Sequence, residues 1–121
     1  MGVQNFKQTK VYQKAFSLAM EIFATTKQFP PEEKYSLTDQ IRRSSRSVCA
    51  CLAEAYRKKK YPAHFSSKVS DADMENSETG VWLDFSVSCQ YIDTEKHNEL
   101  IRKNEEVGRL LGHMINFPDK Y

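Results

Sequence analysis

The three cysteines, Cys49, Cys51 and Cys89, carry the side chains best suited to nucleophilic attack or metal binding. Cys49 and Cys51 lie two residues apart, and on a helix that spacing separates two side chains by about 200° of rotation. Their sulfur atoms would point to opposite sides and could not share a metal ion. No second Cys pair or His-x3-His motif follows, and an odd number of cysteines argues against a disulfide framework. We therefore interpret the cysteines as small buried apolar residues.

Histidines and carboxylates offer no better catalytic or metal site. Helical bundles hold di-iron centres with Glu-x-x-His motifs, and no glutamate here has a histidine three residues later. We interpret a cluster of acidic residues as a solvated face or as partners for arginines: Asp71, Asp73, Glu75, Glu78 and Asp84. The sequence contains neither a Gly-x-Ser-x-Gly motif nor a glycine-rich phosphate loop. It thus predicts no catalytic residue, no metal, no cofactor and no small-molecule substrate, and we expect a protein that is not an enzyme.

The charge distribution is more informative than the net charge of +2. Residues 71–84 contain five acidic residues and no basic one. Residues 42–60 contain one acidic residue, Glu54, and seven basic ones: Arg42, Arg43, Arg46, Arg57, Lys58, Lys59 and Lys60. A basic patch of this size could contact several phosphates with a salt-dependent affinity. These seven residues are our candidate nucleic-acid-binding residues.

Each half of this basic stretch has a second, structural interpretation. Arg42, Arg43 and Arg46 could pair with Glu78 or Asp84 across a helical bundle and fix helix register, and we favour that role for the three arginines. Residues 57–60 lie next to a predicted helix end, where they would either complement the helix dipole or form a phosphate site. Tyr56 and Tyr61 flank this run and could stack on unpaired bases.

Few turn residues are available to connect the elements that position these side chains. The 121 residues contain only 4 Gly and 4 Pro, which favours a few long helices within a single domain spanning 1–121. Breaks at Pro30-Pro31, Pro62 and Asp93-Thr94 divide the chain into helices over about 6–28, 37–59, 63–91 and 95–116, with Ser36 and Asp93 as N-caps. The predicted fold is all-α, an up-down-up-down antiparallel four-helix bundle. No apolar run approaches the roughly 18 residues that span a membrane. Residues 1–10 lack the apolar stretch of a secretory signal, so we expect a cytoplasmic protein.

The third predicted helix carries more apolar surface than one seam can bury. Its first seam is Phe65, Val69, Ala72, Asn76, Thr79, Leu83 and Ser86. A second stripe holds four candidate residues for an oligomer interface: Met74, Val81, Trp82 and Phe85. Either this stripe joins copies of the chain, or the core takes in two adjacent stripes of a central helix. In the first predicted helix, we expect Phe16 to lie on the core side with Ile22.

Residues 29–48, FPPEEKYSLTDQIRRSSRSV, resemble a known family. The pattern Tyr-x-Leu-x-x-Gln-Ile-Arg-Arg over residues 35–43, then Ser47, Ala50, Ala53 and Glu54, is similar to the four-helix bundle proteins of 23S ribosomal RNA intervening sequences, also labelled S23 ribosomal proteins. Residues 77–79 and 82–85 and the pair Tyr91-Ile92 look like one branch of that family. The likeness extends from about residue 11 to residue 117.

The resemblance implies a bundle that assembles as a ring, commonly a homopentamer, without enzymatic activity. A related branch, the accessory protein of diversity-generating retroelements, binds a reverse transcriptase and nucleic acid through basic surface. Two hypotheses follow. In the first, the chain is a noncatalytic homo-oligomer that binds RNA or a nucleic-acid-handling protein through its basic patch. In the second, it is a protein-interaction scaffold or ring with no affinity for nucleic acid.

Overall fold

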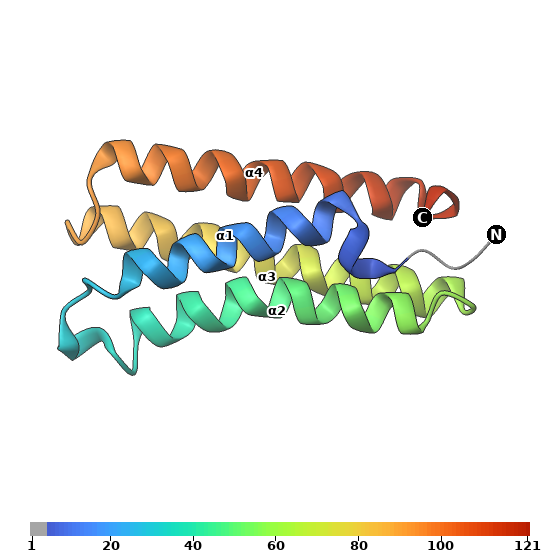
Figure 1. The fold of residues 1–121 in the computed structure, drawn as a ribbon, viewed down its shortest axis with the longest axis horizontal. Helices are drawn as coiled ribbons and strands as arrows, with labels where there is room; N and C mark the ends of the chain where they lie inside the picture. Colours follow the sequence, from blue (N-terminus) through green and yellow to red (C-terminus); the bar gives the residue numbers. More distant parts are fainter. Residues whose placement is uncertain (1–4) are drawn as a thin grey trace.

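The computed structural model describes residues 5–121, which form an all-α, up-down-up-down four-helix bundle (Figure 1). The long helices are α1 (Lys10–Thr26), α2 (Leu37–Arg57), α3 (Pro62–Ser88) and α4 (Thr94–Asn116), and the short 3-10 turns are Phe6–Gln8, Pro31–Glu33 and Pro118–Lys120. Helices α1 and α3 each pack between α2 and α4, so α1 and α3 occupy diagonally opposite corners. The predicted fold class is confirmed.

The helix ends follow local side-chain chemistry. Thr9 caps α1 by accepting the backbone N–H of Tyr12, so that α1 begins at residue 10 and not near residue 6 as expected. Asp93 caps α4 as predicted, accepting the backbone N–H of Lys96 at 2.8 Å. Ser36 occupies the N-cap position of α2, but its side chain makes no cap hydrogen bond. It donates its hydroxyl to Glu33 Oε1, which also accepts the backbone N–H of Leu37.

The predicted seam of α3 is confirmed, because all seven of its residues are buried. The seams of α2 and α4 converge on the same interior, where Leu52, Leu100 and Leu111 have no exposed surface. Helix α1 differs from the expectation. Its core side buries Ile22, but the side chain of Phe16 is 51% exposed. The aromatic positions of α1 therefore extend beyond the seam onto the outside of the bundle.

A pair of asparagines joins α3 to α4 in the interior. The side-chain amide of Asn76 donates to the backbone carbonyl of Asn104 at 2.9 Å, and the amide of Asn104 donates to the carbonyl of Asn76 at 2.8 Å and to its Oδ1 at 3.0 Å. Both residues are buried. Each is followed four residues later by a glycine, Gly80 or Gly108, and a Cβ atom at Gly80 would lie 2.8 Å from Asn104 Oδ1. The glycines thus leave room for the asparagine pair.

Glu33 ties the connection between α1 and α2 to the end of α3. In addition to the hydrogen bonds from Ser36 and Leu37, Glu33 accepts one from the hydroxyl of Tyr91. The distance between the Tyr91 hydroxyl oxygen and Glu33 Oε2 is 2.7 Å. The hydrogen bonds from Ser36, Tyr91 and Leu37 lower the pKa of Glu33 below its ordinary 4.5. The hydrogen bond between Tyr91 and Glu33 also raises the pKa of Tyr91 to about 12, because the carboxylate holds the hydroxyl proton.

We expect Glu33→Gln to lower the melting temperature at pH 7 by more than at acidic pH. A carboxyl whose folded pKa is lowered stabilises the fold above its unfolded pKa, near 4.5, and that stabilisation is lost as the pH falls through the folded pKa. Thermal unfolding followed by circular dichroism between pH 7 and pH 3 measures the difference in melting temperature between the variant and the wild type. Tyr91→Phe removes one of the three hydrogen bonds to Glu33. It should lower the melting temperature at pH 7 as well, but by less than Glu33→Gln does. A difference in melting temperature that does not change with pH would contradict the stabilising role of the ionised Glu33.

Candidate functional site

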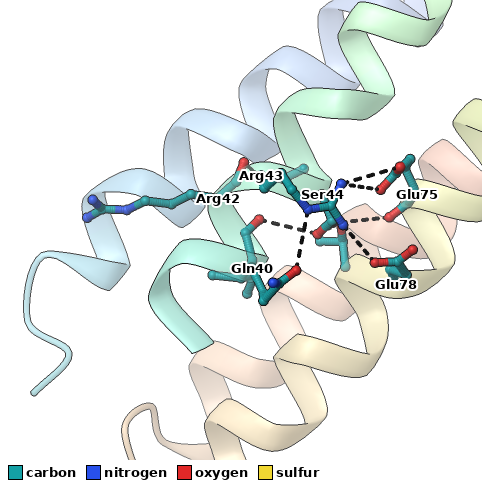
Figure 2. A network of polar contacts seen from close by, with 9 residues as sticks. Gln40, Arg42, Arg43, Ser44, Glu75 and Glu78 are labelled. Atoms are coloured by element: carbon teal, nitrogen blue, oxygen red, sulfur yellow. Dashed lines mark hydrogen bonds and ion pairs between the residues drawn. The ribbon is translucent and has the colours of Figure 1, made fainter. Parts of the chain in front are cut away.

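Arg42, Arg43 and Arg46 of α2 do not share one environment, and Arg43 is the one of the three that pairs with acidic residues. Its guanidinium donates to Glu75 Oε1 at 3.2 Å and to Glu78 Oε1 at 2.8 Å, both on α3 (Figure 2). Its Nε also donates to Gln40 at 3.3 Å. Glu78 is one of the partners that we expected across the bundle. The other, Asp84, instead contacts His97 of α4 at 2.9 Å.

Arg42 and Arg46 reach the opposite side of α2, toward α1. The Nε of Arg42 donates to Thr26 Oγ1 at 2.8 Å, and its guanidinium lies 4.8 Å from the ring centre of Phe23. The guanidinium of Arg46 lies 5.7 Å from the same ring. Within residues 5–121, neither arginine forms an ion pair with a carboxylate. These two arginines keep their positive charge at the seam between α1 and α2.

The run from Arg57 to Lys60 lies at the end of α2 and in the turn to α3. Lys58 is the C-cap residue of α2, and its Nζ lies 5.9 Å from the ring centre of Tyr61. Lys59 Nζ lies 5.6 Å from the ring of Tyr56 and 5.0 Å from that of Phe65. Arg57, Lys58 and Lys60 are exposed, and the part of the chain that the structure describes gives none of the four an ion pair. Their charge is therefore not neutralised within the bundle.

Topology brings further cations to the same end of the bundle. The start of α1 and the end of α4 lie beside the turn between α2 and α3 (Figure 1). We call this surface the basic end. Its basic residues are Lys7, Lys10, Arg57, Lys58, Lys59, Lys60 and Lys120, and its one acidic side chain, among residues 5–10, 57–61 and 117–121, is Asp119. Tyr61 and Phe117, exposed by 57% and 49%, lie there too. Sequence reasoning missed Lys7, Lys10 and Lys120, because only the bundle topology places them beside residues 57–60.

The opposite end of the bundle has no such excess of positive charge. The connection between α1 and α2 contains Lys27, Lys34 and two glutamates, Glu32 and Glu33. In the connection from α3 to α4 and the first turn of α4, Asp93 and Glu95 lie beside Lys96. Acidic and basic residues are thus mixed there, and the bundle is electrostatically polarised along its length.

Three of the four residues expected at an oligomer interface lie on the outside of α3. Met74, Val81 and Phe85 are exposed by 55%, 48% and 53%. Trp82 is half-buried and packs against two of the three core clusters, with its ring centre 6.0 Å from that of Phe85. A groove of about 360 Å³ runs beside these rings and is also lined by Leu37. The alternative of two buried stripes is therefore wrong for the three exposed residues and holds only for Trp82.

The cysteines do not form a site. Cys49 and Cys51 are half-buried against the core, and burial raises the pKa of the Cys49 thiol to about 11. Burial likewise raises the pKa of Cys51. Cys89 is exposed at the end of α3, contrary to the expectation for it. Within the described range, no group of three or more His, Cys, Asp or Glu side chains could hold a metal ion. None of the described helices is long and apolar enough to span a membrane.

The chain is similar to one family and to a solved structure. The model of the 23S rRNA-intervening sequence protein family matches residues 7–113, which include α1 to α3 and nearly all of α4. A solved structure of a protein with unknown function, from the S23 ribosomal protein family of Bacteroides thetaiotaomicron VPI-5482, is 29% identical with a TM-score of 0.79. The comparison covers 88% of this chain and 95% of that chain. No curated protein matches.

Proposed function

The chain belongs to the 23S rRNA-intervening sequence protein family, and from this premise and its polarised charge we propose that it is a noncatalytic, homo-oligomeric helical bundle that binds RNA. The binding surface in this proposal is the basic end. Its ligand is a flexible, single-stranded segment whose phosphates meet lysines and whose bases meet exposed aromatic rings.

The observation that carries the proposal is the gathering of seven cations at one end, none of which forms an ion pair within residues 5–121. Lysine side chains without carboxylate partners are free to replace the counterions of a nucleic-acid backbone, which is the main source of sequence-independent affinity. The exposed rings of Tyr61 and Phe117 add stacking surface beside these cations. The basic end thus offers both contacts that single-stranded RNA uses.

The proposal narrows the candidate residues. Arg43 is neutralised by Glu75 and Glu78, so we assign it to the junction of α2 and α3 and not to the binding surface. Arg42 donates its Nε to Thr26, and the guanidinium groups of Arg42 and Arg46 lie against the Phe23 ring, so we assign both arginines to the junction of α1 and α2. Residues 57–60 remain as binding residues, and Lys7, Lys10 and Lys120 join them.

We expect Lys58→Glu/Lys60→Glu to weaken binding to a single-stranded RNA roughly tenfold to a hundredfold at low salt. The slope of log K against log salt should become less negative by about 1.4, because each lost contact to a single strand contributes about 0.7. Fluorescence anisotropy with a labelled oligonucleotide across a salt series measures both quantities. Both lysines are exposed, so the fold should tolerate the change.

The matched control is Lys34→Glu/Lys96→Glu, which makes the same change of charge at the opposite end of the bundle. It should leave the affinity within about threefold of the wild type, because only long-range repulsion changes. Equal losses in the two double variants would show that net charge alone matters and would overturn the assignment to the basic end.

A scaffold without affinity for nucleic acid is the second candidate function. The exposed apolar residues of α3 favour it, since such residues on an isolated helix face are typical of protein contacts. The same titration separates the two functions. A scaffold gives an assembled protein whose RNA binding is undetectable even at low salt.

A further inference from the structure

A groove of about 590 Å³ lies on the first part of α2 and on the connection that precedes it. Its volume is within the range of small-molecule sites, which is about 300 to 1,000 Å³. We call it the α2 groove. Its lining residues lie between 34 and 50, so it shares no residue with the basic end. The side chains that it offers to a ligand are Lys34, Tyr35, Thr38, Arg42, Arg46 and Ser47.

Three cations of the α2 groove have no carboxylate partner within residues 5–121, and these are Lys34, Arg42 and Arg46. Two of them gather with a further cation at the ring of Phe23 on α1. The guanidinium groups of Arg42 and Arg46 lie 4.8 Å and 5.7 Å from the ring centre, and Lys27 Nζ lies 4.9 Å from it. Positive charges gathered at one ring repel one another, so a bound anion would be favoured beside them.

Both unpaired arginines keep N–H donors for such an anion. A guanidinium has five donors, of which Arg42 uses its Nε on Thr26 and one from Nη2 on the carbonyl of Phe23, at 3.5 Å. Its side chain extends away from Arg43, whose own charge is neutralised by two glutamates of α3 (Figure 2). Arg46 is exposed. Because a planar guanidinium can bind two oxygen atoms of one phosphate side by side, the arginines favour a phosphate ligand.

A buried hydroxyl beside these arginines also lacks a partner. Thr38 lines the groove and is 8% exposed, and its Oγ1 has no hydrogen-bond partner among the described residues. A buried polar atom without a partner is costly and rare. Thr38, Arg42 and Arg46 follow one another at intervals of about one helical turn, so they form a row along α2. Threonine in a helix has two accessible χ1 rotamers, and rotation toward the groove would give its hydroxyl a phosphate oxygen as acceptor.

An exposed aromatic ring lies at the start of this row. Tyr35 lines the groove and is 83% exposed, and Lys34 Nζ lies 5.3 Å from its ring centre. Tyr35 precedes the first residue of α2, whereas Arg46 lies more than two turns into the helix. The α2 groove thus has a ring at one end and guanidinium groups further along. Aromatic rings of this kind stack on the faces of nucleobases.

We propose that the α2 groove binds a nucleoside polyphosphate. The base stacks on Tyr35, and the phosphates lie along Arg42 and Arg46, with Lys34 and the hydroxyl of Ser47 as further donors. This inference goes beyond the proposed function, since it concerns a second ligand on a surface that the RNA does not use.

The acidic residues near the groove favour a short ligand over a continuous strand. Glu32 and Asp39 lie close to Tyr35 in the chain, are exposed, and form no ion pair within residues 5–121. A strand that continued past this end would bring its phosphates against their negative charge. Asp39 itself lines the groove, where its carboxylate is suited to accept a ribose hydroxyl.

The test titrates the full chain with ATP, tripolyphosphate and adenosine by isothermal titration calorimetry, at physiological salt and without divalent cations. ATP should bind most tightly, because it alone contacts both the ring and the guanidinium groups. Lys34→Gln/Arg46→Gln should weaken ATP binding about tenfold or more, since two charged donors are lost. Both positions are exposed, so circular dichroism should show an unchanged helix content. Tyr35→Ala should weaken the binding of ATP and leave that of tripolyphosphate unchanged.

The matched control is Arg102→Gln/Arg109→Gln, which removes two exposed cations from α4. It should leave the affinity for ATP within about threefold of the wild type, and so should the basic-end variant Lys58→Glu/Lys60→Glu. A loss in either variant as large as that in Lys34→Gln/Arg46→Gln would overturn the assignment to the α2 groove. A wild type that does not bind ATP excludes the site altogether.

Two further results would contradict the identity of the ligand. Tripolyphosphate that binds as tightly as ATP, or a Tyr35→Ala variant that binds ATP like the wild type, would exclude recognition of the base. If Lys34→Gln/Arg46→Gln weakened RNA binding as much as ATP binding, the groove would belong to the RNA surface and would not hold a separate ligand. A chain that binds ATP in the groove but no RNA contradicts only the proposed function.

Discussion

Asn104→Ala is expected to lower the free energy of unfolding by about 2 to 3 kcal/mol, a large effect for a polar residue. The substitution removes the amide that donates to the backbone carbonyl and to Oδ1 of Asn76. Asn76 Oδ1 then lies buried without that donor, and the lost side chain leaves a space between α3 and α4. A buried acceptor without a partner costs more than the mean net value of a hydrogen bond, which is about 1 kcal/mol.

A double-mutant cycle with Asn76→Ala isolates the contribution of the pair. Urea unfolding of the two single variants and the double variant should give a coupling energy of about 1 kcal/mol or more, because the second substitution removes the Asn76 Oδ1 that has already lost its donor from Asn104. Asn98→Ala, at an exposed position of α4, should change the stability by no more than about 0.5 kcal/mol. Additive losses in the cycle would mean that the asparagines act independently.

The course of the helices could be predicted from the sequence because their breaks are local. Pro62 begins α3, where its missing N–H is not needed, and Asp93 caps α4. Periodicity identified the buried residues of α3 as well, including Asn76 and Thr79. The pairing of Asn76 with Asn104 depends on the register between two helices, which spacing within one helix does not determine.

The error at Phe16 has a physical cause. Its spacing from neighbouring apolar residues fits a helix seam, and periodicity does not distinguish a wide buried stripe from a buried seam with an exposed apolar margin. The structure separates the two, with Ile22 inside and Phe16 outside. On α3 the same ambiguity was visible in the sequence, because the second stripe lay well apart from the first. An apolar margin beside a seam is thus harder to recognise than a separate stripe.

The candidate site was predictable only where it is contiguous in the chain. Arg57 to Lys60 are adjacent residues, and their lack of carboxylate partners among residues 5–121 fits the interpretation as a binding surface. The 3-10 turns Phe6–Gln8 and Pro118–Lys120, which contain Lys7 and Lys120, lie far apart in the sequence, and the antiparallel topology brings them to the same end of the bundle as this run (Figure 1). Arg42 and Arg43 show the converse. They are adjacent in the chain, but Arg42 contacts α1 and Arg43 contacts α3.

Gly80→Ala and Gly112→Ala are expected to change stability in opposite directions, although both glycines lie inside long helices. Alanine in a helix interior is normally favoured over glycine by about 1 kcal/mol. At Gly112 no atom lies within 4 Å of the new Cβ, so the variant should gain up to about that amount. At Gly80 the new Cβ would lie 2.8 Å from Asn104 Oδ1 and would push this side chain away from Asn76.

The displacement at Gly80 should outweigh the helix propensity and leave the variant less stable by about 1 to 2 kcal/mol. The difference between the two alanine variants, about 2 to 3 kcal/mol, is measured by urea unfolding under identical conditions. Combining Gly80→Ala with Asn104→Ala tests the cause. Because the clash requires the Asn104 side chain, the glycine substitution should no longer destabilise the chain in that background, and an unchanged penalty there would show that the close contact is not responsible.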